Sequence, residues 1–244
     1  MTVNAALAQL DAEIVSCRAC PRLVEWRERV GHEKRAAFRN DVYWARPITG
    51  FGDPDPWLVI IGLAPAAHGA NRTGRVFTGD RSADFLIAAM HRKGMASQST
   101  SDHAGDGLTL TGCRMTAAVR CAPPANKPTP DEAQACRPFL LRELAACPRT
   151  RVLLALGGFA WQAVLRVLDP PRPWPTFGHG TEIDIGQFTL LGSYHPSQQN
   201  TFTGRLTPAM LDGVLTRALQ VAAAAGPPPT DHSPAERFVK GNTT

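Results

Sequence analysis

Short apolar runs that end near glycine, separated by segments with helical periodicity, recur along this chain. In the first, Trp57-Leu58-Val59-Ile60-Ile61 runs into Gly62. A continuous apolar run of this length is typical of a strand buried on both faces. Similar strands are predicted at 114–119, 151–156 and 188–192, with helices between them. This alternation predicts an α/β fold in which a mostly parallel sheet has helices on both faces, in one domain.

The helices are predicted from periodicity and end signals. Thr129-Pro130-Asp131-Glu132 forms a capping box with proline at the first helical position, so a helix begins there and runs to about Cys147. Further helices are predicted over 3–16, after Asp80, from Gly158 to about Leu168, and over 208–224. The folded domain is expected to span 1–225, and the proline-rich segment 226–244 to form a flexible tail.

Composition excludes several classes of protein. Hydrophobic residues make up 43% of the chain and charged residues 19%, which excludes wholesale disorder. No apolar run approaches the ~20 residues of a membrane span, and the first ten residues lack signal-peptide features. We therefore expect a cytoplasmic protein that does not bind membranes. A net charge of +5 favours a polyanionic partner, although many proteins without a nucleic-acid role share it.

Six cysteines in a chain without a secretion signal favour metal binding or catalysis over disulfides. Cys17 and Cys20 form a C-x2-C pair, and Cys121 and Cys136 supply two more thiols. Four thiolates fit either a tetrahedral zinc or an iron–sulfur cluster, and spacing alone does not choose between them. The alternative is that all the cysteines are unrelated core residues. Cys113 and Cys147 lie where small buried thiols are common.

Three polar loops follow predicted strands, at 62–80, 120–128 and 193–207. Ligands of parallel sheets bind beyond the carboxyl ends of the strands, so these loops are expected to converge on one site. The first loop is not a phosphate-binding P-loop, because no Gly-Lys-Ser/Thr opens the next helix. Its phosphate-binding residue types are Asn71, Arg72, Thr73 and Arg75, and Phe77 offers an aromatic face. Asp80 is either an N-cap or a carboxylate beside the ligand.

The loop after the fourth strand places His195 at a strand end, where a histidine is either structural or catalytic. Hydroxyl, amide and guanidinium groups follow it, and such groups hydrogen-bond DNA phosphates without reading sequence. The residues expected to do so are Ser197, Asn200, Thr201, Thr203 and Arg205.

Together these segments resemble the uracil-DNA glycosylase superfamily, and most closely its family 5, the B-type enzymes. The resemblance covers about 14–220 and is carried by four segments, 62–75, 195–205, Cys17-x2-Cys20 and 121–127. It implies a three-layer α/β/α domain with a central four-stranded parallel sheet. It also implies a structural [4Fe–4S] cluster, with Cys17, Cys20, Cys121 and Cys136 as the matching ligands.

The activity implied by the resemblance is excision of uracil and other deaminated bases (hypoxanthine, xanthine, ethenocytosine) from double- or single-stranded DNA by a monomer. Catalysis would fall to Asp80, Asn126 and His195, and base binding to Gly62, Ala64, Phe77, Asn126 and His195. Other families of the superfamily have a polar residue in the first motif, whereas Leu63, Ala64 and Ala66 are apolar here, and Ala117 stands where an asparagine reads uracil. A pocket with few fixed polar partners tolerates a wider set of bases. Gln198, Gln199 and Leu206 are candidates for a wedge into the duplex.

Three alternatives remain at this stage. The first is a zinc-bound nucleic-acid-binding module without catalysis, the second is a ferredoxin-like redox component, and the third is a small-molecule hydrolase that uses His195. The hydrolase lacks the Gly-x-Ser-x-Gly elbow that would supply its nucleophile.

Overall fold

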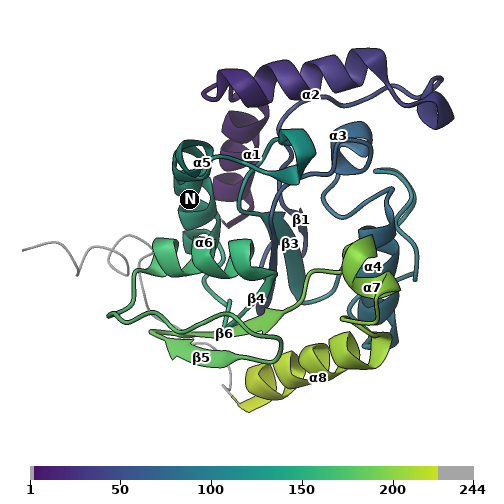
Figure 1. The fold of residues 1–244 in the computed structure, drawn as a ribbon. Helices are drawn as coiled ribbons and strands as arrows, with labels where there is room; N and C mark the ends of the chain where they lie inside the picture. The colour runs from purple at the N-terminus through teal and green to yellow at the C-terminus, as the bar shows by residue number, and fades with distance from the viewer. Residues whose placement is uncertain (1–2, 225–244) are drawn as a thin grey trace, which may run out of the picture.

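The computed structural model describes residues 3–224. The expected tail at 226–244 lies outside the described residues. A six-stranded sheet runs through the domain in the order β1-β3-β2-β4-β6-β5 (Figure 1). Its four central strands are parallel to one another and overlap the four predicted strands: β3 (Cys113–Ala117), β2 (Leu58–Gly62), β4 (Val152–Leu156) and β6 (Phe188–Ser193).

Two short antiparallel edge strands, β1 (Phe51–Gly52) and β5 (Glu182–Ile185), extend the sheet beyond the four strands expected. β1 covers only two residues, and β5 alternates exposed with half-buried side chains, so neither has the continuous apolar run of a central strand. The predicted fold class, α/β with a mostly parallel sheet, is confirmed. The predicted count of four strands applies to the parallel part of the sheet.

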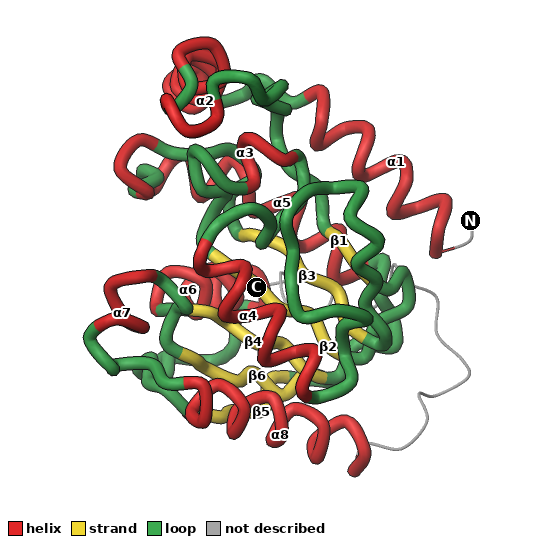
Figure 2. Tube along the Cα trace, turned by 90° about the vertical axis from the view of Figure 1, so that its right-hand side faces the viewer, coloured by secondary structure: helices red, strands yellow, loops and turns green. Residues whose placement is uncertain are grey.

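Helices cover both faces of the sheet, as Figures 1 and 2 show. Along β2, Leu58 and Ile60 face one core together with α4 (Arg81–Arg92) and α8 (Pro208–Ala224). Val59 and Ile61 point to the other core, against α5 (Pro130–Ala145) and α6 (Gly158–Leu168). Successive strand side chains point to opposite faces, so a strand that is apolar at every position needs a helix layer on each side.

The N-terminal segment adds two helices beside this sandwich. α1 (Val3–Ser16) has the predicted bounds, and α2 (Pro21–Glu33) begins directly after the C-x2-C pair. A 3₁₀ turn, η1 (Ala36–Phe38), follows. α2 was not predicted, although Pro21 at its first position is a start signal. None of the helices between residues 3 and 224 combines the length and apolar character that crossing a bilayer requires.

Short helices lie within the three loops that were expected to form the site. They are α3 (Ala70–Thr73), the 3₁₀ turn η2 (Pro124–Asn126) and α7 (Gln198–Phe202). Both views place α3 and α7 on the same side of the molecule (Figures 1 and 2). The loops therefore converge beyond the carboxyl ends of the parallel strands.

Candidate active site

A cavity of about 300 Å³ opens beyond the carboxyl ends of β2, β3 and β6. This volume is at the lower end of the range for ligand pockets. The cavity is lined by residues from all three loops and by Ala117 at the end of β3. Every side chain proposed for base binding or catalysis lines it: Gly62, Ala64, Phe77, Asp80, Asn126 and His195.

Phe77 and His195 lie side by side in the cavity wall. Their ring centres are 6.4 Å apart and the ring planes are inclined by 33°. Phe77 has a φ of +47°, a backbone conformation that is strained for an aromatic residue and recurs at functional sites. A Cβ on Gly62 would lie 2.7 Å from Phe77 Cζ, so the glycine is what lets the ring approach the end of β2.

The His195 side chain is held in an environment that keeps its ring neutral. Burial lowers the pKa of His195 to about 4, so the imidazole is uncharged at neutral pH. Its backbone carbonyl accepts a hydrogen bond of 2.9 Å from Asn200 Nδ2, which ties the end of β6 to α7. A neutral imidazole carries one N–H donor, which it can offer to an oxygen atom in the cavity.

Asp80 is the N-cap of α4 and also lines the cavity, so the N-cap interpretation is confirmed, while its role as a carboxylate beside a ligand stays a prediction. Its Oδ1 accepts hydrogen bonds from Ser82 N at 2.9 Å and Ala83 N at 3.0 Å, at the start of α4. A Cβ on Gly69 would lie 2.1 Å from Oδ2, so that glycine leaves room for the carboxylate. Burial raises the pKa of Asp80 above its usual range, while the two N–H groups act in the opposite direction.

Asn126 lies at the exposed rim of the cavity, on η2. Ala125 and Asn126 have consecutive positive φ values of 51° and 55°, so the turn presents the amide from a left-handed backbone. Ala117 pairs with Gly62 between β3 and β2, and it is fully buried. Together with Ala64 and Ala66 it gives the inner wall of the cavity a non-polar surface.

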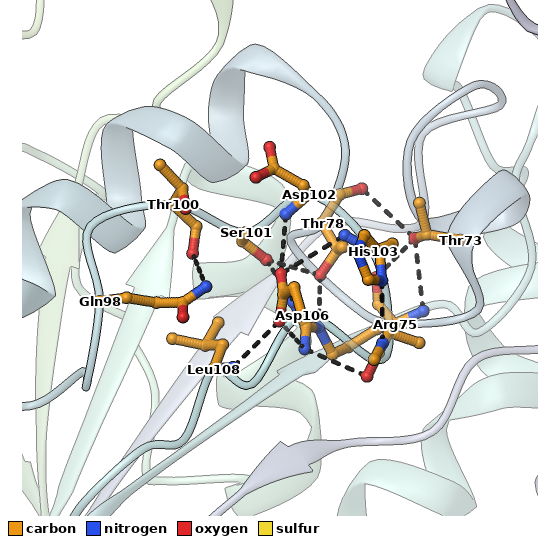
Figure 3. A network of polar contacts seen from close by, with 12 residues as sticks. Thr73, Arg75, Thr78, Gln98, Thr100, Ser101, Asp102, His103, Asp106 and Leu108 are labelled. Carbon is orange, nitrogen blue, oxygen red and sulfur yellow. Dashed lines mark hydrogen bonds and ion pairs between the residues drawn. The ribbon is translucent and has the colours of Figure 1, made fainter.

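The polar residues of the first loop make hydrogen bonds within the protein. Asn71 and Arg75 are buried, which argues against them as phosphate contacts, whereas Arg72 and Thr73 are partly exposed and their contact with phosphates stays a prediction. Arg75 is 5% exposed and makes hydrogen bonds of 2.9 and 2.6 Å to Asp106. It also donates to Ser101 Oγ and Thr78 Oγ1, and Figure 3 shows these partners around it. Thr73 Oγ1 donates to the carbonyls of Arg75 and Thr78. A buried ion pair of this kind fixes the shape of the loop below the cavity.

Arg72 and Asn71 are used in the same way. Arg72 donates to the His68 and Gly79 carbonyls and to Asp41 Oδ2, and it stacks on the Phe38 ring at 4.0 Å. Asn71 is fully buried and donates to the Arg27 carbonyl at 3.3 Å. The residue types were those of a phosphate site, but their hydrogen bonds go to protein because the loop folds around them.

The loop after β6 is more open. Ser197 caps α7 and lines the cavity, and Thr201 Oγ1 bonds back to the Ser197 carbonyl. Thr203 and Arg205 are exposed, with the Arg205 guanidinium 4.6 Å from the centre of the Tyr194 ring. Leu206 is 1% exposed and packs in the core, so it is excluded as a wedge. Gln198 and Gln199 are exposed on α7.

Phe202 was missed by the sequence analysis. It ends α7, its exposed fraction is 68%, and the guanidinium of Arg81 lies 5.8 Å from its ring centre. Arg81 begins α4 directly after Asp80, so this aromatic side chain stands close to the cavity mouth. The available signal was an apolar residue inside a polar loop, Thr201-Phe202-Thr203.

The four cysteines expected to act together line one small cavity beside α2. Cys17, Cys20, Cys121 and Cys136 share it with Arg27 and Arg120. Burial raises the pKa of the Cys136 thiol to about 12 and also raises that of Cys121. Within residues 3–224, no group of three or more His, Cys, Asp or Glu side chains is placed to hold a metal ion. Cys113 and Cys147 are buried elsewhere, in core positions.

Comparison with known proteins agrees with this geometry. The model of the Uracil DNA glycosylase superfamily matches residues 49–218, and the chain belongs to that superfamily. A type-5 uracil-DNA glycosylase of Mycobacterium tuberculosis is 54% identical over 220 residues, which are 89% of this chain and 82% of that protein. One from Thermus thermophilus is 50% identical over 210 residues, 86% and 95% of the two chains.

The similarity to a type-4 enzyme is lower. A type-4 uracil-DNA glycosylase of Archaeoglobus fulgidus is 27% identical over 165 residues, 67% of this chain and 66% of that protein. Within the superfamily, the chain therefore belongs to family 5.

Proposed function

We propose that this protein is a monofunctional uracil-DNA glycosylase, which hydrolyses the bond between a damaged base and deoxyribose and leaves an abasic site in base excision repair. The observation that carries the proposal is the meeting of Phe77, Asp80 and His195 in one cavity. Enzymes that act on a base within a duplex flip the nucleotide into such a pocket. The relatives named above are uracil-DNA glycosylases, which supports the same reaction here.

The proposed reaction uses each of these side chains differently. Phe77 stacks on the extruded base, an interaction worth about 1–3 kcal/mol by analogy with single-strand binding. When the C1′–N bond breaks, its electron pair moves to the base, and neutral His195 donates a hydrogen bond to the base oxygen that gains charge. Asp80 faces the sugar, stabilises its positive charge and orients the water that adds to C1′. Asn126, at the rim, is the next candidate for holding the water or the base.

The breadth of substrates is part of the proposal. The inner wall is formed by alanines, including Ala117, and no side-chain amide lies there to select uracil. A site without such a partner cannot reject a base that differs at its polar edge. We therefore expect hypoxanthine, xanthine and ethenocytosine to be excised as well as uracil.

The proposed DNA-binding surface is the exposed part of the loop after β6. Phe202, Thr203 and Arg205 are exposed, Asn200 and Thr201 are half-buried, and Ser197 lines the cavity. Arg205 meets phosphates, and Phe202 contacts the bases that flank the flipped nucleotide, because an apolar side chain at a helix end can enter an opened base step. We expect the protein to act as a monomer in the cytoplasm, at the nucleoid.

We propose that the four-cysteine cavity holds a [4Fe–4S] cluster. Its donor set is four thiols, and the buried Nε of Arg27 and both Nε and Nη1 of Arg120 have no hydrogen-bond partner in the described part of the chain. These N–H groups are available to the sulfurs of an anionic metal–thiolate site. Such a cluster would join the start of α2 to the 121–136 segment and so serve a structural role.

The test is incubation with duplexes that carry uracil, hypoxanthine, xanthine or ethenocytosine, followed by alkali to cut abasic sites. Strand cleavage with the wild type and its loss with His195→Ala and Asp80→Asn would support the proposal. An iron-loaded wild type that cleaves none of the duplexes would refute it. A colourless protein that contains zinc, binds DNA and leaves no abasic site would instead establish the alternative, a non-catalytic nucleic-acid-binding module.

A further inference from the structure

Two buried arginines, Arg27 of α2 and Arg120 after β3, line the four-cysteine cavity. They are 2% and 1% exposed, among the largest fully buried or nearly buried side chains of the described residues. Charged side chains are almost never this deeply buried without a partner of opposite charge. The partners of the two guanidinium groups therefore bear on what the cavity holds.

The carboxylates near these arginines do not balance them. Glu143 is 1% exposed and is shared, because it accepts from Arg114 Nε at 2.7 Å and also from Arg120 Nη2. Asp11 lies 3.9 Å from Arg114 and is partly exposed. Glu143 and Asp11 thus pair with Arg114 and Arg120, and neither of them pairs with Arg27.

Among residues 3–224, Arg27 has no buried carboxylate as a partner. The nearest is Glu28, which lies 3.9 Å away with its side chain 44% exposed. Its Nη1 instead donates to Cys121 Sγ at 2.9 Å, its Nη2 donates to the Cys17 carbonyl at 3.2 Å, and its Nε is unpartnered. Both residues that it reaches belong to the four-cysteine set.

Arg120 approaches the same cavity from the other side. Its backbone hydrogen-bonds the Cys136 thiol, and its side chain keeps only Glu143 as an anionic partner. Its Nε and Nη1 are buried without partners. The protein thus places two buried guanidinium groups against the four cysteines, with N–H groups that have no acceptor among residues 3–224.

We infer that Arg27 and Arg120 are the built-in counter-charge of the metal–thiolate site, and that Arg27 depends on the bound group for its own stability. The inference rests on the cluster put forward above. Four thiolates around a [4Fe–4S]²⁺ core carry a net charge of about −2, and hydrogen bonds to their sulfurs stabilise that charge. Arg27, which contacts Cys121 and the Cys17 carbonyl, then links the middle of α2 to the bound group, in addition to the ligand Cys20 at the start of the helix.

This role makes a prediction that a purely structural role does not make. In the loaded protein, Arg27→Met should lower the thermal unfolding temperature and speed the loss of iron to a chelator at least tenfold. In the metal-free protein the same variant should unfold at a higher temperature than the wild type, because it removes a buried charge that has no anion. Arg27→Lys keeps the charge, so its unfolding temperature and its rate of iron loss should lie between those of the wild type and those of Arg27→Met.

The matched control is Arg29→Met, on the same helix, where the side chain is 48% exposed and stacks on Trp26. It should leave the iron loss rate and both unfolding temperatures near those of the wild type. Iron content and broad absorption near 400 nm give readouts that do not depend on excision. Arg120→Met, measured in the loaded form, should also speed iron loss.

The inference is overturned if Arg27→Met lowers the unfolding temperature equally with and without metal, or if it releases iron at the wild-type rate. A wild type that holds neither iron nor zinc, and is unchanged by Cys121→Ser, overturns the metal site itself and with it this inference. If the purified protein contains zinc, only the assignment of iron is overturned, because four thiolates around Zn²⁺ carry the same net charge. The release of zinc to a chelator is then measured in place of the release of iron. Abasic-site formation by the wild type tests the glycosylase proposal separately from all of these results.

Discussion

The ring of Phe77 and the imidazole of His195 lie 6.4 Å apart, although 117 intervening residues separate them along the chain. One is supplied by the loop after β2 and the other by the end of β6, and β4 lies between these strands in the sheet. The sheet therefore places an aromatic surface for stacking beside a hydrogen-bond donor. A flat base that stacks on the first is within reach of the second.

Replacing His195 should reduce catalysis far more than it reduces DNA binding. The proposed N–H donor meets charge that appears on the base only as the bond breaks, so its loss affects the transition state. His195→Ala should lower kcat for uracil excision by about 10²–10³, the usual effect of removing one such donor. Single-turnover excision and an equilibrium binding measurement on the same duplex check this. A comparable loss in both would show that His195 contributes to binding alone.

The pH dependence of stability should show that folding holds His195 in its neutral form. Its pKa in the folded protein is lowered to about 4, below the usual 6.5, so the unfolded chain takes up a proton first as the pH falls. This contribution to stability is complete above about pH 6.5 and is lost as the pH falls toward 4. Urea unfolding at several pH values should show a smaller loss between pH 7 and 4 for His195→Phe. Equal losses in both proteins would contradict the burial effect.

Asp80 has two roles that one pair of variants separates. Asparagine caps helices about as well as aspartate, so Asp80→Asn should change the free energy of unfolding by less than about 0.5 kcal/mol. Asp80→Ala should cost about 1 kcal/mol, because the Ser82 and Ala83 N–H groups lose their acceptor. Both variants should lose excision activity by at least about 10². If Asp80→Asn excises uracil at the wild-type rate, the carboxylate serves only as a cap.

Much of the fold was predictable because local signals agreed with the tertiary structure. β2 and β4 were recognisable from continuous apolar runs, and β3 and β6 from segments in which polar residues interrupt the apolar ones. The capping box at Thr129 marks the start of α5 as expected. The edge strands β1 and β5 carry no such run, and α2 is defined by contacts that are far away in sequence. Arg22 of α2, for example, pairs with Glu132 at 2.7 Å. Apart from Pro21 at the start of α2, a local window of residues contains no signal for these elements.

The residues that line the cavity could be predicted from the sequence, but the hydrogen bonds and ion pairs that hold the first loop could not. Gly62 and the strand-end position of His195 predicted one shared site, and both residues line the same cavity. Sequence could not tell that Arg75 would pair with Asp106, 31 residues further along. An arginine in a glycine-rich loop has the same composition whether it faces a phosphate or a buried carboxylate, and only the fold decides which partner it meets.

Substitution of Arg205 should therefore affect DNA binding, whereas substitution of Arg75 should affect stability. Arg205→Ala should weaken binding to every DNA sequence and lower the salt slope of log K by about one, without changing stability. Arg75→Met leaves Asp106 buried without its partner, so it should cost about 3–5 kcal/mol of unfolding free energy. Binding titrations at several salt concentrations and urea unfolding check both. An unchanged salt slope for Arg205→Ala would remove that residue from the DNA-binding surface.

Phe202 should contribute to excision from duplex DNA more than to folding. Its side chain is 68% exposed, so Phe202→Ala should change the free energy of unfolding by no more than about 0.5 kcal/mol. An aromatic side chain that enters an opened base step contributes about 1–3 kcal/mol, so excision of uracil from a duplex should fall about 5- to 100-fold. Excision from a single strand should fall less, because no neighbouring base pair has to be opened. Val42→Ala, which removes another exposed apolar side chain (91%), is the control and should act like the wild type. Equal losses of Phe202→Ala activity on the duplex and on the single strand would mean that Phe202 holds the strand without helping to open the duplex.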